Sequence, residues 1–205
     1  TGKIIYESRA TTGGNSYMSE DFSNSDVEIL AYTGGVGNTI LRAGTLKCKN
    51  FTVTTTLNNV QMLNTTYNPS FIFSGDVDLE AGVNSTTYSA GGGTILLTGV
   101  AKNIRLAGLT VEKITINTGA TYTFLEGFES GNFTANGEGT FDPTKSYDVD
   151  NPTGASTLHS TTPVTAYIYY DGLNTFSGTL DNVVLVENES GQTRHDIVIQ
   201  KPNKV

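Results

Sequence analysis

The sequence predicts an all-β protein, with a short β-solenoid or irregular β core followed by a C-terminal antiparallel meander. Thr (32), Gly (23), Asn (18) and Ser (15) make up 88 of the 205 residues, which excludes helical bundles and coiled coils. Tyr (10) and Phe (9) alternate with polar residues along the chain, a pattern that argues against disorder. Short apolar segments recur about every eight to ten residues between Gly or Asn, as the strands of an all-β fold do.

The first two zones of the chain contain most of the predicted strands. Residues 1–43 form an N-terminal strand region, with strands expected at 3–6 and 27–32. Residues 44–142 form the core, for which an antiparallel sandwich and a solenoid compete. A sandwich needs Asn-Gly or Asp-Gly hairpins between its strands. From residue 93 onward, single glycines or Gly-Ala pairs separate the strands instead, which favours the corners of a solenoid. These glycines are Gly99, Gly108, Gly119 and Gly137.

Three segments of the core resemble the repeats of a known group of proteins. Residues 93–99, 108–122 and 131–142 look like repeat segments of parallel β-helix surface proteins. These proteins include bacterial adhesins of the filamentous-haemagglutinin and autotransporter type, and phage tail fibres and tailspikes. The resemblance covers about a quarter of the chain, and residues 126–130 interrupt its spacing. It implies a structural or adhesive role at a surface, often as a trimer.

The remaining two zones differ in their proline content. Residues 143–163 carry three of the five prolines among Asp, Asn, Ser and Thr, so we expect a loop or linker there. In residues 164–205, strands are expected at 164–170, 179–186 and 197–199. The segments 171–172 and 189–191 supply turn residues between these strands, which predicts an antiparallel meander that caps the solenoid.

Charge and cysteine content exclude several classes of function. The chain has 12 basic and 20 acidic side chains, and its basic residues form no cluster, so we expect no nucleic-acid partner. No apolar stretch approaches the roughly 18 residues of a membrane span, so we expect no membrane insertion. The single cysteine, Cys48, permits neither an internal disulfide nor a cysteine-based metal site. Its spacing from Leu46 predicts a buried, inert thiol.

Three acidic residues at alternate positions are the best candidates for catalysis. Asp76, Asp78 and Glu80 would face one side of a strand, and carboxylate pairs carry out glycoside hydrolysis. However, alternation with Val77 and Leu79 is also the default pattern of a half-buried strand. No basic or aromatic partner is nearby in sequence, so we assign no catalytic residue and predict that the protein is not an enzyme.

A second acidic group lies in the proline-rich zone. Asp148, Asp150 and Asn151, together with Asp142, offer oxygen atoms to a hard cation. Pro152 takes a position that the calcium-loop pattern gives to a ligand, and Asp and Asn are common in turns anyway. A metal site and a plain loop therefore remain the two alternatives, and no cofactor is expected.

Two tyrosines in the last zone are candidates for ligand binding. Alternation puts Tyr167 and Tyr169 on one face, where they can stack on sugar rings or cover a subunit contact. Residues 178–187 also resemble the final strand of jelly-roll carbohydrate-binding modules. The two histidines, His159 and His195, lie in turn-rich segments without a G-x-S-x-G nucleophile motif, and we interpret them as surface residues.

Together these patterns predict a non-enzymatic structural protein of an extracellular particle or cell surface. A phage or virus virion is the first choice, with the chain acting as a fibre, tailspike or capsid-decorating subunit. The expected partners are further copies of the chain, other virion or surface proteins, and a glycan. A carbohydrate-binding adhesin module is the first alternative, and a polysaccharide-degrading β-helix enzyme is the second.

Overall fold

The protein is a parallel β-solenoid, as the sequence predicts. The computed structural model describes residues 2–8, 20–31, 39–40, 44–54, 60–61, 68–79, 93–106 and 110–188. These residues form strands and no helix. No helix that is long and apolar enough to cross a membrane occurs among them.

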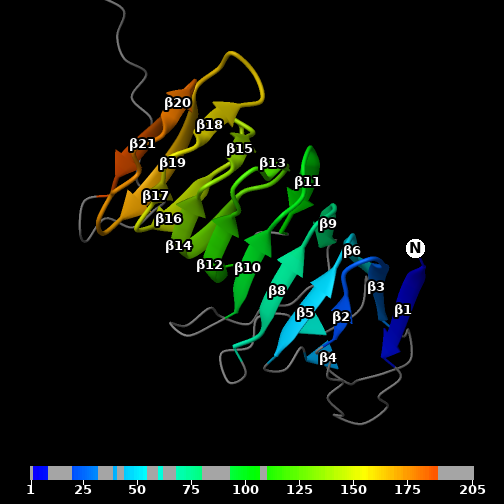
Figure 1. Cartoon of the computed structure of the whole chain (residues 1–205). Coiled ribbons are helices and arrows are strands. Elements are labelled where there is room, and N and C mark those ends of the chain that lie inside the picture. The colour runs from blue at the N-terminus through cyan, green and yellow to red at the C-terminus, as the bar shows by residue number, and fades with distance from the viewer. Residues whose placement is uncertain are drawn as a thin grey trace, which may run out of the picture.

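Two parallel sheets run the length of the stack (Figure 1). The nine-stranded sheet has the order β1-β3-β6-β9-β11-β13-β15-β18-β20, and the ten-stranded sheet has the order β2-β5-β8-β10-β12-β14-β16-β19-β21. From β8 to β16 the chain alternates between the two sheets, so each strand pairs with the strand one coil earlier. β17 pairs with β14 beside β16, and β4 and β7 form a small third sheet.

The strands are short, and their bounds are as follows. The nine-stranded sheet contains β1 (Lys3–Ser8), β3 (Asp26–Ala31), β6 (Phe51–Thr54), β9 (Val77–Leu79), β11 (Lys102–Arg105), β13 (Thr121–Phe124), β15 (Glu138–Phe141), β18 (Thr157–Ser160) and β20 (Thr179–Asp181). The ten-stranded sheet contains β2 (Asp21–Phe22), β5 (Thr45–Cys48), β8 (Ser70–Phe73), β10 (Thr94–Leu97), β12 (Thr110–Ile116), β14 (Phe128–Ala135), β16 (Tyr147–Asp150), β19 (Ala166–Asp171) and β21 (Val183–Glu187). The others are β4 (Thr39–Ile40), β7 (Val60–Gln61) and β17 (Thr153–Gly154).

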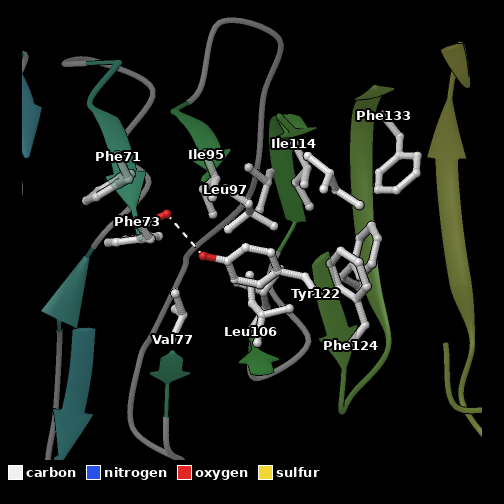
Figure 2. Packing of buried hydrophobic residues seen from close by; sticks show 14 of the residues in the cluster. Phe71, Phe73, Val77, Ile95, Leu97, Leu106, Ile114, Tyr122, Phe124 and Phe133 are labelled. Atoms are coloured by element: carbon white, nitrogen blue, oxygen red, sulfur yellow. Dashed lines mark hydrogen bonds between the residues drawn. The ribbon is translucent and has the colours of Figure 1, made fainter. Parts of the chain in front are cut away.

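Alternation along each strand places one side chain in the core and the next outside. In β10, Ile95 and Leu97 are buried, whereas Thr94 and Leu96 are only partly covered. The same pattern in both sheets fills the space between them with one continuous apolar core (Figure 2). The alternation also explains why Thr is frequent. Half of the strand positions point outward, and Thr suits them because it is both β-branched and polar.

Aromatic side chains stack along the core from coil to coil. Phe124 and Phe141 pair across β13 and β15, with ring centroids 5.0 Å apart and nearly parallel planes. Tyr122 points into the same core, and its hydroxyl donates to the backbone oxygen of Phe73 at 3.0 Å (Figure 2). Offset stacking of this kind adds to the free energy gained from burial alone.

The number of residues per coil varies along the chain, from 27 between β9 and β11 to 17 between β13 and β15. Asp76 contacts Asn50 and Asn103, which lie 26 and 27 residues away in sequence and one coil away in space. Farther along, Thr110 contacts Glu129, only 19 residues away.

The structure corrects two sequence-based expectations for the last third of the chain. Residues 143–163 do not form only a loop or linker, because they contain β16, β17 and β18. The strands of 164–188 form no antiparallel meander: β19 pairs in parallel with β16 and β21, and β20 pairs in parallel with β18. Asp171-Gly172 makes a corner between the sheets rather than a hairpin. The strand expected at 197–199 lies outside the described residues.

Candidate functional site

The outer face of the ten-stranded sheet brings both predicted sites together in the last coils. In β19, Ala166 and Ile168 are buried in the core, so Tyr167 and Tyr169 lie on the outer face and are half-buried. Tyr169 is adjacent to Asp148 in the parallel ladder between β16 and β19. The candidate aromatic site and the candidate metal site are therefore neighbours on one surface.

The two tyrosines continue into an apolar strip on the next strand. Tyr167 pairs with Val184 and Tyr169 pairs with Val186 across β19 and β21. Burial raises the pKa of Tyr169 above its ordinary value, and the nearby Tyr167 adds to this increase. The Tyr169 phenol is therefore neutral at pH 7, so its hydroxyl can both donate and accept a hydrogen bond there.

Three aspartates cluster beside this strip. Asp148, Asp150 and Asp171 each place a carboxylate oxygen within 4.8 Å of the other two. Asp150 and Asp171 are direct partners in the ladder, and Asp148 lies two residues before Asp150 on the same face. Although Asp148 faces outward, it is only 6% exposed, and Asn188 approaches its Oδ2 at 3.5 Å. Carboxylate oxygens at this separation suit a hard cation such as Ca²⁺.

Asn151, the third residue of the predicted metal site, lies directly after β16. Its backbone is left-handed, with a φ of 45°, and its Oδ1 accepts a hydrogen bond from the Leu173 N–H at 3.1 Å. It therefore holds a corner between two coils, and Asp171 is the third residue that the structure groups with Asp148 and Asp150. Sequence reasoning missed Asp171 because only the length of this coil brings it next to Asp150. Whether this group binds a metal stays a prediction.

The earlier acidic group lies on the other sheet and takes part in contacts between coils. Val77 and Leu79 are buried, so Asp76 and Asp78 face outward, and Glu80 lies outside the described residues. The Asn103 N–H donates to Asp76 Oδ1 at 2.8 Å. Asp78 is adjacent to Arg105, a basic residue that sequence proximity did not reveal.

Arg105 bridges two carboxylates from different coils. Its Nη1 lies 3.2 Å from Asp78 Oδ1, and its Nε lies 3.3 Å from Glu126 Oε1. All three side chains are between a third and a half exposed, so solvent weakens each pair. These ion pairs connect neighbouring coils on the outer face of the nine-stranded sheet.

The remaining titratable candidates have local partners or are buried. His159 Nδ1 lies 3.2 Å from Asp181 Oδ2, and its Nε2 lies 3.9 Å from Glu138 Oε2. His195 lies outside the described residues. Cys48 is buried, and this burial raises the pKa of its thiol to about 12. A thiol with this pKa is not ionised at neutral pH, which agrees with the inert role expected for it.

Comparisons with known proteins add no further candidate. A scan against protein-family models, a search of curated proteins and a search of solved structures each return no match.

Proposed function

We propose that this chain is a non-enzymatic structural component of an extracellular particle that works by assembling with other protein subunits. A phage or virus virion is the first choice, with the chain as a fibre, tailspike or capsid-decorating subunit. The alternative location is a cell surface. This choice of particle comes from the resemblance of residues 93–142 to parallel β-helix surface proteins, and the further partners are other virion or surface proteins.

The observation that carries this proposal is that, in the part of the chain that the structure describes, each sheet ends on both sides in a strand with a single partner. Among the described residues, β1 and β20 each have one partner strand in the nine-stranded sheet, and β2 and β21 each have one in the ten-stranded sheet. The backbone groups along such edges favour pairing with another chain. Solenoids are also stabilised by stacking one unit on the next, which suits an assembling subunit.

The proposal is tested by measuring the mass of the native protein. Sedimentation equilibrium of residues 1–205 from micromolar to millimolar concentration should show a defined oligomer that dissociates on dilution. Negative-stain electron microscopy of the same samples should show particles of matching size. A chain that remains monomeric over the whole range, and that no particle contains, contradicts the proposal.

A second candidate function is glycan binding at the outer face of the ten-stranded sheet. It is favoured by one specific observation, the adjacency of Tyr167 and Tyr169 to the three-aspartate group. Aromatic rings stack on the apolar faces of sugars, and carboxylates accept hydrogen bonds from sugar hydroxyls. Ligand sites commonly combine apolar surfaces with a few polar groups that fix the orientation of the ligand.

A glycan array with Tyr167→Ala and Tyr169→Ala combined tests this second function. Thr115→Ala is the matched control, because Thr115 also lies half-buried on the outer face of the same sheet. The double variant should lose binding while remaining folded, whereas the control should bind like the wild type. If the double variant binds as well as the control, the tyrosines do not form a glycan site.

A further inference from the structure

The outer face of the ten-stranded sheet changes character in its last two strands. β16, β19 and β21 are neighbours in this sheet (Figure 1). One strand earlier, on β14, the outward positions include Glu129, Asn132 and Thr134. On β19 and β21 the outward side chains are large and mostly apolar, and they form the Tyr–Val face: Tyr167, Tyr169, Val184 and Val186. Val184 is 41% exposed, so a ligand that covers this face removes apolar surface from water, which is favourable.

The geometry of the Tyr–Val face suits a chain of sugar rings. Tyr167 and Tyr169 are two positions apart on one strand, which places their Cα atoms about 7 Å apart. Val184 and Val186 lie beside them on the next strand and extend the surface sideways. Aromatic rings stack on the apolar faces of sugars, and phenol hydroxyls form hydrogen bonds with sugar hydroxyls. The two tyrosines can therefore contact neighbouring rings of one linear glycan.

The charges beside the Tyr–Val face are negative. β16 contains two acidic residues, β19 and β21 contain one each, and none of these three strands contains a basic residue. Lys145, in the turn before β16, lies close to Asp142. Asp171 follows Tyr169 by two positions on the same side of β19, and its carboxylate lies within 4.8 Å of that of Asp150. A positively charged group on the ligand is therefore attracted to this end of the face, whereas an anionic group is repelled.

We infer that the Tyr–Val face binds a linear glycan of amino sugars, with sugar rings stacked on Tyr167 and Tyr169 and a protonated sugar amine paired with the Asp171 carboxylate. This inference rests on the proposed glycan-binding function and names the class of sugar. A protonated amine forms a charge-assisted hydrogen bond with a carboxylate, which is stronger than one between neutral groups. A neutral glycan keeps the stacking contacts but lacks this bond, so it binds more weakly.

Two tetrasaccharides that differ only at the amine test the inference. Isothermal titration calorimetry at about pH 6 compares the tetramer of β-linked glucosamine with the tetramer of N-acetylglucosamine. At this pH the glucosamine amines are protonated and the aspartates are ionised, whereas acetylation removes the positive charge. We expect the glucosamine tetramer to bind about tenfold more tightly. Added salt should weaken its binding and leave that of the acetylated tetramer unchanged.

Variants of the chain separate the ion pair from the stacking contacts. Asp171→Asn should weaken binding of the glucosamine tetramer about fivefold and leave the acetylated tetramer unaffected. Glu138→Gln is the matched control, because it removes one negative charge from an exposed position of the other sheet, and it should bind both tetramers like the wild type. Tyr167→Ala combined with Tyr169→Ala should weaken binding of both tetramers. Circular dichroism and urea unfolding establish that each variant is folded.

A lysine tetrapeptide, which carries amines without sugar rings, shows whether charge alone is recognised, and it should bind more weakly than the glucosamine tetramer. The inference is overturned if the acetylated tetramer or the peptide binds as tightly as the glucosamine tetramer, if folded Asp171→Asn keeps full affinity, or if neither tetramer binds. Glycan binding itself stands if the array shows a glycan whose binding depends on the two tyrosines. It is overturned together with the inference if neither tetramer binds and the array shows no such glycan.

Discussion

At the scale of single residues, the Tyr122 hydroxyl connects three successive coils. Its single proton is shared between the carbonyls of Phe73 and Gly75, each 3.0 Å from the hydroxyl oxygen, which also accepts from the Gly99 N–H at 3.2 Å. Tyr122→Phe removes these contacts and leaves the buried Gly99 N–H without this acceptor. We expect urea unfolding to show that the free energy of unfolding falls by about 1–3 kcal/mol. Tyr169→Phe, on the outer face, is the control and should cost much less, so equal losses would contradict this role.

The same hydroxyl makes stability depend on alkaline pH. Burial raises the pKa of Tyr122 from its ordinary value of 10 to about 12. Below pH 10 the phenol is neutral in both states, and its contribution to stability is complete. Between pH 10 and 12 the unfolded chain loses this proton while the folded chain keeps it, so the free energy of unfolding falls by at most about 1.4 kcal/mol per pH unit.

Burial also raises the pKa values of Cys48 and Tyr147, so both contribute to the same alkaline loss of stability. Urea unfolding of the wild type and Tyr122→Phe at several pH values from 9 to 12 separates these contributions. The variant should lose stability less steeply than the wild type above pH 10. Parallel curves for the two proteins would show that Tyr122 does not titrate in this range.

At the scale of elements, a polar ladder holds the corner that leads into the nine-stranded sheet. Asn50 donates to Asp26 Oδ1 and accepts from the Asp76 N–H, and Asp76 accepts from the Asn103 N–H, all at 2.8 Å. Gly75 lies beside this corner ladder, formed by Asp26, Asn50, Asp76 and Asn103. A Cβ atom at Gly75 would lie 2.0 Å from Asn50 Oδ1 and 2.6 Å from the Lys49 carbonyl.

Gly75→Ala should therefore displace the Asn50 side chain and the adjacent backbone. We expect a loss of about 1–3 kcal/mol in the free energy of unfolding, the usual cost of an added methyl group in a closely packed place. Gly2→Ala is the control, because a Cβ atom added at Gly2 would meet nothing within 4 Å, and no change is expected. Equal free energies of unfolding for the two variants would show that the corner accommodates the added methyl group without loss of stability.

The strands were easier to predict from sequence than their partners. Alternation identifies strands such as Thr94–Leu97, and Gly99 and Gly137 lie at corners where the backbones of two coils come close together. The local sequence does not determine whether a strand after a turn pairs with its predecessor or with a strand one coil earlier. Asp171-Gly172 therefore resembled a hairpin turn, and the variable coil length concealed the approach of Asp171 to Asp150.

At the scale of the whole molecule, stability should decrease from the middle of the stack toward its ends. An interior coil packs against two neighbours, whereas a terminal coil has only one. The core shows this difference directly: Leu158 is 1% exposed, whereas Leu180, its ladder partner in the edge strand β20, is 40% exposed. Local opening then requires less free energy at β20 and β21 than at β12–β14.

Amide hydrogen exchange at low protein concentration, where copies are separate, tests this gradient. Protection should be highest in β12–β14 and lowest in β20 and β21. Phe124→Ala removes a ring that lies 5.0 Å from both Phe128 and Phe141, so it should cost about 3–5 kcal/mol and speed exchange on both sides. Leu180→Ala should cost less and change only the last coils, because its side chain is already partly in water. Uniform amide protection along the chain would contradict the gradient, and so would equal losses of unfolding free energy in Phe124→Ala and Leu180→Ala. Either result would mean that the solenoid unfolds as one unit and that its end coils are as stable as its centre.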